Sequence, residues 1–427
     1  MYIAVFIGLV MILFVLGFAI PYALGITALV GMMMTSSSFG ISNMQTIATK
    51  MTTGVNSFTL MAIPLFLLSG KLMNVGSITD RIFKFCNALV GWIPGGLGQV
   101  NILASIVFAG MSGSAVADAA GLGTIEIAAM KEEGFDSEFA AGITAASSTI
   151  GPIIPPSIPL IIFGCVGGVS ISKLLVGGII PGVVCGLCLG VMVAMISIRR
   201  HYPRRKLPTL KELWTLFKRS ILSLLTPIIL IGGILSGQFT ATEAASVASA
   251  YALILTVLIY REISWTQLKE VVRDTCTDTA SIMLVVAAST FYGYMITKCM
   301  IPQAVLKLFL SISSNSAIFL LLINVFLLFV GCFMETNAAI MILAPILLPA
   351  AISFGIDPVH FGLIMVFNLM IGLLTPPVGM CLYATARVAG ISFEDQVKGT
   401  SWFYIPLAIT LICITAFPWL STFLGNL

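Results

Sequence analysis

The chain has 427 residues, of which 59% are hydrophobic and only 9% are charged, and its mean hydropathy is +1.09. One soluble core cannot bury so much apolar sequence, so the composition excludes a soluble domain and predicts an integral membrane protein with about ten spans of about 20 residues. The formal net charge of +4 gives no reason to expect nucleic acid as a partner. The nine cysteines lie mostly in apolar segments, where thiols behave as small hydrophobic groups.

The first stretch of the chain predicts two spans followed by an amphipathic arm. Residues 1–34 form one apolar run that Pro21 and Gly25 interrupt, which predicts two helices joined by a tight bend. The N-terminus lacks a basic stretch and a small-residue cleavage site, so we interpret it as a retained first span. The amphipathic arm is expected at 44–56, and a further span begins at Phe58.

Residues 96–133 predict a re-entrant hairpin. Its two apolar limbs are each too short to cross a bilayer, and small polar residues join them at 110–118. Such a hairpin enters and leaves the membrane on one side, and it places its polar tip at membrane depth.

A broken span at 137–168 follows the hairpin. Pro155 and Pro156 remove amide donors from an apolar segment that is otherwise long enough to cross the bilayer as one helix. Backbone groups freed in this way are tolerated in hydrocarbon only where protein or a water-filled cavity satisfies them. Broken spans at matching places in two halves of a chain indicate the midplane site of a secondary transporter.

The next helix, at 177–198, has a glycine at every fourth position. These glycines are Gly178, Gly182, Gly186 and Gly190. Such a stripe lets another backbone approach closely, and the partner is expected to be a helix of the same chain or else another subunit. A basic run at 199–206 then predicts a cytoplasmic anchor within a linker at 199–220.

The second half of the chain repeats this plan. Its expected elements are spans at 226–238 and 280–297, an arm at 264–278, a hairpin at 316–353, a broken helix at 359–388 and a final helix at 402–423. A shift of 221 positions superimposes the two breaks, Gly151 on Gly372, Pro155 on Pro376 and Pro156 on Pro377. One constant offset over this length indicates a duplication, and hairpins that enter from opposite sides require two repeats of inverted topology.

The basic residues indicate the orientation. With residue 1 outside and 199–206 inside, most of them fall on the inner side, as the positive-inside rule requires. The inner set is Arg81, Lys84, Lys131, Arg199, Arg200, Arg204, Arg205, Lys206, Lys211, Lys218, Arg219, Arg261, Lys269, Arg273, Arg387 and Lys398. The outer set is Lys50, Lys173, Lys298 and Lys307. Both termini are therefore expected on the periplasmic or exterior side.

Polar groups at membrane depth form the candidate sites. A hard cation such as Na⁺ prefers several neutral oxygens, and the C-terminal ends of half-helices add partial negative charge. The expected sodium ligands are Ser112, Gly113, Ser147, Thr149, Gly151, Pro155, Glu335, Gly372, Thr375 and Pro376. Helix N-termini at the tips offer amides to an anion. The expected substrate-binding residues are Ser112, Ser114, Asp118, Glu335, Thr336 and Asn337.

Structural alternatives stay open for these residues. Serine, threonine and glycine in membrane helices also mediate packing. A carboxylate at membrane depth is costly unless it is paired, hydrated or near an interface, so Asp118 and Glu335 are open between function and structure. Glu243 is expected to act as a helix cap or hinge anchor, and Pro156 and Pro377 are expected hinges.

The sequence resembles the large membrane subunit of tripartite ATP-independent periplasmic (TRAP) transporters, the DctM family, over nearly its whole length. Four stretches carry the resemblance, namely GMSGSAVAD at 110–118, GPIIPPS at 151–157, GGI at 232–234 with FTATEAA at 239–245, and TPPVG at 375–379. The resemblance implies a sodium-driven importer of a small organic acid anion in a bacterial inner membrane. The implied partners are a small membrane subunit of about four spans, a periplasmic substrate-binding protein and membrane lipid.

The resemblance also implies an elevator carrier, in which a transport domain slides against a scaffold. The scaffold is then expected at 1–57, 169–279 and 389–427, and the transport domain at 58–168 and 280–388. The expected fold class is an all-α polytopic membrane protein with two inverted repeats, each containing a re-entrant hairpin and a discontinuous helix. Ser114 is matched by Glu335, so the two ion sites need not be chemically equal. The family favours sialic acid as substrate, followed by a C4-dicarboxylate.

Other classes of protein remain as alternatives. A stand-alone divalent-anion/sodium symporter of similar repeat architecture would need no binding protein. An ion channel or a membrane-embedded enzyme is more remote, because the sequence has no HExxH pair, GxSxG elbow or phosphate loop. His201 and His360 are expected in solvated or interfacial positions, and Glu126 near the aqueous end of its hairpin.

Overall fold

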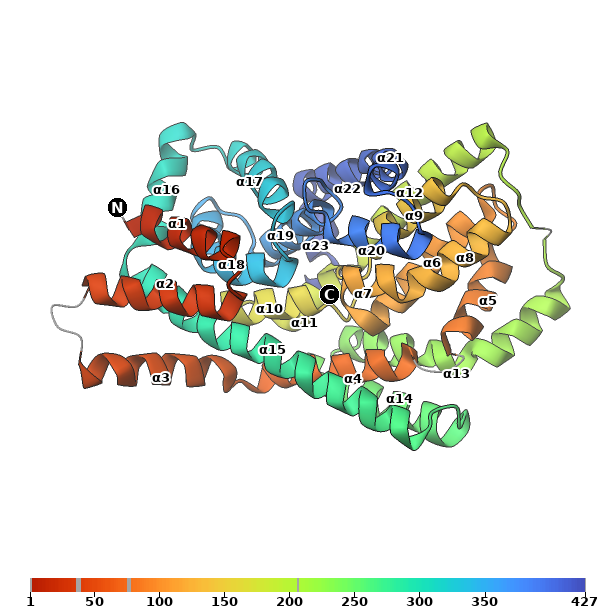
Figure 1. Cartoon of the computed structure of the whole chain (residues 1–427), viewed down its shortest axis with the longest axis horizontal. Helices are drawn as coiled ribbons and strands as arrows, with labels where there is room; N and C mark the ends of the chain where they lie inside the picture. The colour runs from red at the N-terminus through yellow and green to blue at the C-terminus, as the bar shows by residue number, and fades with distance from the viewer. Residues whose placement is uncertain (1, 36–39, 75–77, 206, 427) are drawn as a thin grey trace.

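The computed structural model describes the backbone of residues 2–35, 40–74, 78–205 and 207–426, and their side chains except at 2–4, 15, 109–112 and 426. Every regular element in these ranges is a helix (Figure 1). The first half contains α1 (Tyr2–Val15), α2 (Ile20–Thr35), α3 (Ile41–Val55), η1 (Phe58–Met61), α4 (Ala62–Asn74), α5 (Ile78–Val90), α6 (Gly96–Ser112), α7 (Ala115–Ala120), α8 (Leu122–Glu132), α9 (Ser137–Ser148), α10 (Ile158–Gly167), α11 (Ile171–Gly177) and α12 (Ile179–Arg200). The second half contains α13 (Leu210–Leu235), α14 (Ala241–Leu253), η2 (Ile254–Ile259), α15 (Trp265–Lys298), α16 (Ile301–Ile312), α17 (Ser316–Gly331), α18 (Thr336–Ser353), α19 (Pro358–Gly372), α20 (Met380–Ala389), α21 (Phe393–Ser401), α22 (Tyr404–Ala416), α23 (Trp419–Thr422) and η3 (Leu424–Asn426).

Several of these helices have the length and composition of membrane spans. In the described ranges, 5 helical segments are long and apolar enough to cross a membrane, and the count reaches 8 if each of 3 bent helix pairs is one span. The sequence-based expectation of about ten spans is higher than this number, because several apolar segments that were counted as spans are divided into shorter helices in the structure. The breaks between α9 and α10 and between α19 and α20 leave pieces shorter than a bilayer requires.

The two halves share one order of elements. The start of α7 lies 221 positions before the start of α18, and the end of α8 lies 221 positions before the end of α18. The start of α2 likewise lies 221 positions before the start of α14. The halves also exchange packing partners, since α14 packs on α4 while α2 packs on α15. Figure 1 shows α15 running obliquely across the face of the molecule, past both α2 and α4. The offset found in the sequence is therefore matched by helix bounds and by packing.

The second arm and the span after it form one continuous helix, contrary to the sequence-based expectation. α15 begins after Ser264, whose hydroxyl oxygen accepts a hydrogen bond from the amide of Gln267 in a capping box, and it continues to Lys298. The polar stretch at 275–279 contains neither glycine nor proline, so nothing in its backbone chemistry ends the helix. The expected boundary between arm and span therefore falls inside α15.

The boundaries of the first bend and of the basic linker also differ from expectation. The chain bends at Gly17, whose φ is 82°, while Pro21 lies in the first turn of α2, where a missing amide is tolerated. The linker is helical from Leu210 onward, because Thr209 and Glu212 form a capping box. Two helices that the sequence pattern did not assign, α5 and α16, precede the two hairpins.

The glycine face of α12 packs inside the chain. A Cβ atom at Gly178 would collide with the carbonyl of Ile153 in the first break. The side chain of Gln99 in α6 donates to the carbonyl of Gly190 at 2.8 Å. The expectation that this stripe contacts the same chain is therefore confirmed, and the stripe holds the first hairpin and the first break in place.

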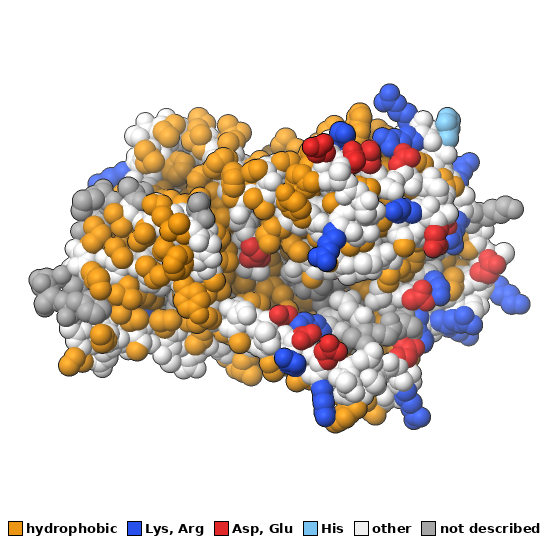
Figure 2. Space-filling model, viewed as in Figure 1, with side chains coloured by type: hydrophobic (Ala, Val, Ile, Leu, Met, Phe, Trp, Pro, Cys, Tyr) orange, Lys and Arg blue, Asp and Glu red, His pale blue; other side chains and the backbone are white. Residues whose placement is uncertain are grey.

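Charged side chains gather at one end of the molecule. Figure 2 shows hydrophobic side chains over the end that contains α1, α2 and α3, and acidic and basic side chains over the opposite end. That end contains α5, α8, α12 and α13 and the basic segment between α12 and α13 (Figure 1). Ion pairs at this end include Arg200, the last residue of α12, with Asp136 at 2.7 Å, and Arg205 of the basic segment with Glu133.

Candidate functional site

The tip of the first hairpin lies against the first broken span. Gly113 ends α6 with a φ of 60°, and a Cβ atom there would lie 3.2 Å from the carbonyl oxygen of Pro156 and 3.3 Å from the amide of Ile158. Both the positive φ and this close approach favour glycine. The hairpin and the break therefore meet backbone to backbone.

The second hairpin meets the second break in a similar way. A Cβ atom at Gly331, the last residue of α17, would lie 2.9 Å from the Cα atom of Gly372 at the end of α19. A Cβ atom at Gly372 would in turn collide with the backbone of Gly331. Glycine at both positions thus lets α17 and α19 pack with their backbones in contact, and this contact positions the second tip.

The second limb of each hairpin begins with a side-chain cap. The hydroxyl oxygen of Ser114 accepts from the amide of Ala117 at 3.4 Å at the start of α7. The Oε2 atom of Glu335 accepts from the amide of Ala338 at 3.1 Å at the start of α18, and its Oε1 atom accepts from Nδ2 of Asn337 at 2.9 Å. A carboxylate is stabilised at a helix N-terminus. Glu335 therefore occupies the position that the sequence suggested for a substrate anion at α18.

Asp118 lies one turn beyond Ser114 and is only 6% exposed. A Cβ atom at Gly151 would collide with Oδ2 of Asp118, so this carboxylate lies directly over the glycine of the first break. The structure therefore brings Asp118 and Gly151 together, although 33 positions separate them in the sequence. The side chain of Ser112 falls outside the described residues.

A buried polar network joins three helices behind the first tip. Nδ2 of Asn101 in α6 donates to Oε2 of Glu126 in α8 at 2.6 Å and to Oγ1 of Thr144 in α9 at 2.7 Å. The hydroxyl of Ser147, also in α9, donates to Oδ1 of Asn101 at 2.5 Å. All four residues are at most 2% exposed. The expectation that Glu126 lies near an aqueous end was wrong, because Asn101 supplies a hydrogen-bond partner in the interior.

The threonines of the two breaks hydrogen-bond to their own helices. The hydroxyl of Thr149 donates to the carbonyl of Ala146 at 2.7 Å, and that of Thr375 donates to the carbonyl of Ile371 at 2.9 Å. The carbonyl of Gly372 accepts from the amide of Thr375 at 2.8 Å. Each oxygen keeps a further lone pair, since hydroxyl and carbonyl oxygens have two. These groups are therefore chemically able to coordinate a cation.

The prolines of the two breaks form matching features. The peptide bonds Pro155-Pro156 and Pro376-Pro377 are both cis. In the first break the hydroxyl of Ser157 donates to the carbonyl of Pro152 and accepts from the amide of Leu160 in the first turn of α10, so Ser157 caps this helix. In the second break the hydroxyl of Tyr404 donates to the carbonyl of Leu374 at 2.5 Å. Side chains thus satisfy part of the backbone that the prolines free.

Glu243 and His360 have structural environments. Oε2 of Glu243 accepts from the amide of Thr240 at 2.8 Å within a capping box, so of its two expected roles the cap is the one observed. His360 is only 1% exposed, and its Nδ1 lies 3.3 Å from the hydroxyl of Ser421. The expectation of a solvated or interfacial His360 was wrong, because α23 folds back against α19 and covers it.

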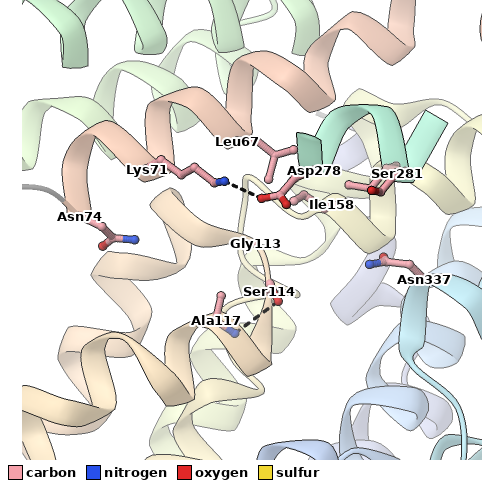
Figure 3. Close-up of a pocket in the computed structure, with 12 residues that line it drawn as sticks. Leu67, Lys71, Asn74, Gly113, Ser114, Ala117, Ile158, Asp278, Ser281 and Asn337 are labelled. Atoms are coloured by element: carbon pink, nitrogen blue, oxygen red, sulfur yellow. Dashed lines mark hydrogen bonds and ion pairs between the residues drawn. The ribbon is translucent and has the colours of Figure 1, made fainter. Parts of the chain in front are cut away.

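A cavity of about 320 Å³ lies between the two hairpin tips (Figure 3). Gly113 and Ser114 line it from the first tip, and Asn337 lines it from the second. Its remaining lining residues come from α4, α7, α10 and α15, namely Leu67, Gly70, Lys71, Asn74, Ala117, Ile158, Asp278, Ser281 and Ile282. Thr336, beside Asn337, is buried at 1% exposure. Oδ1 of Asn337 and Oγ1 of Thr336 have no hydrogen-bond partner among the described residues.

An ion pair between α4 and α15 lies at the edge of this cavity. Nζ of Lys71 lies 2.5 Å from Oδ2 of Asp278, and the two side chains are 27% and 51% exposed (Figure 3). Neither residue stands out in the sequence, because Lys71 lies near the end of a span and Asp278 at the end of an expected arm. Charges in such places are usually interfacial, and only the packing of α4 against α15 brings these two together.

A polytopic helical protein whose interrupted spans and hairpin tips surround a small cavity with a few polar and charged groups has the architecture of a membrane transporter. The family described as "Tripartite ATP-independent periplasmic transporter, DctM component" matches residues 7–420. The chain therefore belongs to the DctM family of TRAP transporters, and it is a multi-pass transporter subunit and not an enzyme.

Curated relatives and a solved structure agree with this assignment. The chain is 44% identical to the sialic acid TRAP transporter large permease protein SiaM of Vibrio cholerae, covering 96% of this chain and 95% of that protein. It is 36% identical to the C4-dicarboxylate TRAP transporter large permease protein DctM of Pseudomonas aeruginosa, covering 91% of each. The crystal structure of the Alcanivorax borkumensis YdaH transporter superimposes with a TM-score of 0.60 over 89% of both chains, and at 11% identity this likeness concerns the fold alone.

Proposed function

We propose that this chain is the sodium-coupled large permease of a TRAP transporter and that it imports an organic acid anion across a bacterial inner membrane. The observation that carries the proposal is the cavity between the hairpin tips, which Ser114 lines from one half and Asn337 from the other. A substrate held there contacts elements of both halves. Relative movement of the surrounding elements then alters access to it, as alternating access requires.

Two sodium sites are proposed, one at each junction of a tip with a break. The first uses the backbone of Gly113, Gly151 and Pro155 together with the side chains of Ser112, Ser147 and Thr149, and the side chain of Asp118 adds negative charge beside it. The second uses the backbone of Gly372 and Pro376 with the side chains of Glu335 and Thr375. The close approach of tip and break in both halves supports these sites, because it brings polar groups of two separate elements near each other.

The proposed mechanism is of the elevator type. A transport domain of 58–168 and 280–388 would move against a scaffold of 1–57, 169–279 and 389–427, with Pro156 and Pro377 at its hinges. Because α15 is continuous across residue 279, it would connect the two domains. The two repeats would have inverted topology, with both termini in the periplasm. The exchange of packing partners between α2 with α15 and α14 with α4 supports two structurally equivalent halves. Membrane lipid would surround the scaffold.

The proposed partners are a small membrane subunit and a periplasmic substrate-binding protein. Membership of a tripartite family supports both, and the binding protein would make the first selection of substrate. Sialic acid is the first substrate to test, because the relative named for sialic acid is 44% identical, and a C4-dicarboxylate is the second, because the relative named for it is 36% identical.

Reconstitution into proteoliposomes tests this function. Uptake of radiolabelled sialic acid should require an inward sodium gradient, the small subunit and a substrate-loaded binding protein. Omission of any one should reduce uptake to the level of empty liposomes. Sodium-dependent uptake by this chain alone would instead favour the stand-alone symporter, and a continuous ion current without solute uptake would favour a channel.

A further inference from the structure

The cavity between the tips contains one pair of opposite charges. Among its described lining residues, Lys71 carries the positive charge and Asp278 the negative charge. Figure 3 shows both side chains at the edge of the cavity, on the side opposite Ser114. Asn337 faces the same space from α18. An anion that enters the cavity therefore meets one ammonium group, and that group is already paired.

The pair is built so that it can open. The side chain of Asp278 is 51% exposed, so water can solvate its carboxylate when Lys71 leaves it. Exposed ion pairs contribute little to stability, because solvation replaces most of the attraction. Lys71 is less exposed, at 27%, so water would solvate its ammonium group less completely and the unpaired state would cost more free energy. If a carboxylate of the bound anion replaces that of Asp278, the ammonium group of Lys71 has a partner both before and after binding.

We propose that Lys71 binds the carboxylate of the transported anion, and that Asp278 holds Lys71 only while the cavity is empty. This inference rests on the proposed function and assigns a residue to substrate recognition within it. A substrate carboxylate offers Nζ the same acceptor geometry that Oδ2 of Asp278 offers at 2.5 Å. The substrate class is therefore an organic anion with at least one carboxylate free to reach α4.

The exchange also gives a physical reason for sodium coupling. The empty cavity is neutral with respect to this pair, since one lysine balances one aspartate. A bound monoanion adds a negative charge and releases Asp278, so a cation near the tips is needed to restore neutrality. Asp118 and Glu335, at the junctions of tip and break, increase this requirement. Binding of the anion and of Na⁺ should then favour each other.

A merely structural ion pair between α4 and α15 is the competing explanation, and four variants separate the two. If Lys71 binds substrate, Lys71→Gln should raise the KM for the anion about tenfold or more, which corresponds to about 1.4 kcal/mol. Lys71→Arg should stay within about threefold of wild type, since it keeps the charge. Asp278→Asn should change KM in the opposite direction, lowering it about threefold, because Lys71 no longer has a competing partner.

The charge-reversed double variant Lys71→Asp with Asp278→Lys is the decisive arm. It restores an ion pair between α4 and α15 but moves the ammonium to the other helix, so KM should remain about tenfold raised. Lys84→Gln is the matched control, because Lys84 pairs with Asp80 at 2.5 Å within α5 and does not line this cavity. Its KM should equal that of wild type.

All variants are measured in the reconstituted three-component system, with thermal unfolding of the purified complex in parallel. Equal losses in Lys71→Gln and Asp278→Asn together with recovery in the reversed variant would overturn the proposal in favour of a structural tie. If Lys71→Gln does not fold, Asp278→Asn still decides by the direction of its KM change, because the proposal predicts a lower KM and a structural tie predicts a loss of uptake. Sodium-dependent uptake by the wild type together with an unchanged KM in Lys71→Gln would refute only this assignment. Sodium-independent uptake by the wild type would refute the proposed function.

Discussion

Ser114 and Glu335 lie 221 positions apart and cap the helices that form the second limbs of the two hairpins, one with a hydroxyl and the other with a carboxylate. The helix starts are equivalent, so the two caps differ by one negative charge, while the first junction has the carboxylate of Asp118 over Gly151. A carboxylate attracts a nearby cation more strongly than a hydroxyl does. Each proposed sodium site therefore has one carboxylate near it, carried by the helix cap at the second junction and by Asp118, one turn beyond the cap, at the first.

The first prediction concerns this charge. Glu335→Gln keeps an oxygen that can accept from the amide of Ala338, so the cap of α18 should survive while the charge is lost. The sodium concentration for half-maximal uptake should rise about threefold to tenfold, and thermal unfolding should change little. Ser114→Ala is the comparison, because it removes a neutral cap and should cost about 1 kcal/mol of stability. An unchanged sodium dependence in Glu335→Gln would leave Glu335 as a helix cap only.

The second prediction concerns the glycine contact of the second break. Gly372→Ala forces a methyl group into the backbone of Gly331, and backbone cannot rotate aside as a flexible side chain can. We expect a loss of about 2 kcal/mol or more and little assembled protein in the membrane. Gly232→Ala in α13 is the control, because a Cβ atom there meets nothing within 4 Å. It should be neutral or slightly stabilising, as alanine favours helix. Thermal unfolding and membrane yield measure both.

The third prediction concerns the buried network behind the first tip. Asn101→Leu and Glu126→Leu each leave a polar partner buried without a hydrogen bond, which should cost about 2–3 kcal/mol. The double variant should lose less than the sum of the two, because it removes both partners. Glu132→Leu is the control, because Glu132 lies at an exposed position of α8, the helix that contains Glu126, and its replacement should change the stability little. Additive losses measured by thermal unfolding would show that Asn101 and Glu126 act independently.

The breaks and the hairpins could be predicted because proline and glycine change the backbone itself. The proline pairs at 155–156 and 376–377 interrupt their apolar segments, whereas the single prolines Pro345 and Pro349 lie inside α18. The offset of 221 positions links the two halves without knowledge of their packing. The start of α9 at Ser137 and the end of α18 at Ser353 agree with the expected bounds of the first broken span and the second hairpin. The course of α15 was not predictable in the same way, since a polar stretch without a helix breaker is compatible with either a joint or a continuous helix.

The interior charges could not be predicted, because their partners come from helices distant in sequence. Glu126 near the end of a short limb resembles an interfacial residue until Asn101 lies beside it. Lys71 and Asp278 are separated by more than two hundred positions and meet only because α4 packs on α15. The sequence identifies which residue types are costly at depth, but the pairing that makes them tolerable is a property of the tertiary structure.

The last prediction concerns the orientation of the two repeats. An inverted pair needs the basic segment at 199–206 on the cytoplasmic side and both termini outside, in agreement with the positive-inside rule. A fluorescent protein that folds only in the cytoplasm should therefore emit when inserted after Arg204 and remain dark when fused after Leu427. Alkaline phosphatase, active only in the periplasm, should give the opposite pattern. Replacing Arg199, Arg200, Arg204 and Arg205 by glutamine should weaken this orientation, because these residues make up much of the basic asymmetry. Cytoplasmic fluorescence from the C-terminal fusion of the unaltered chain would contradict the inverted topology.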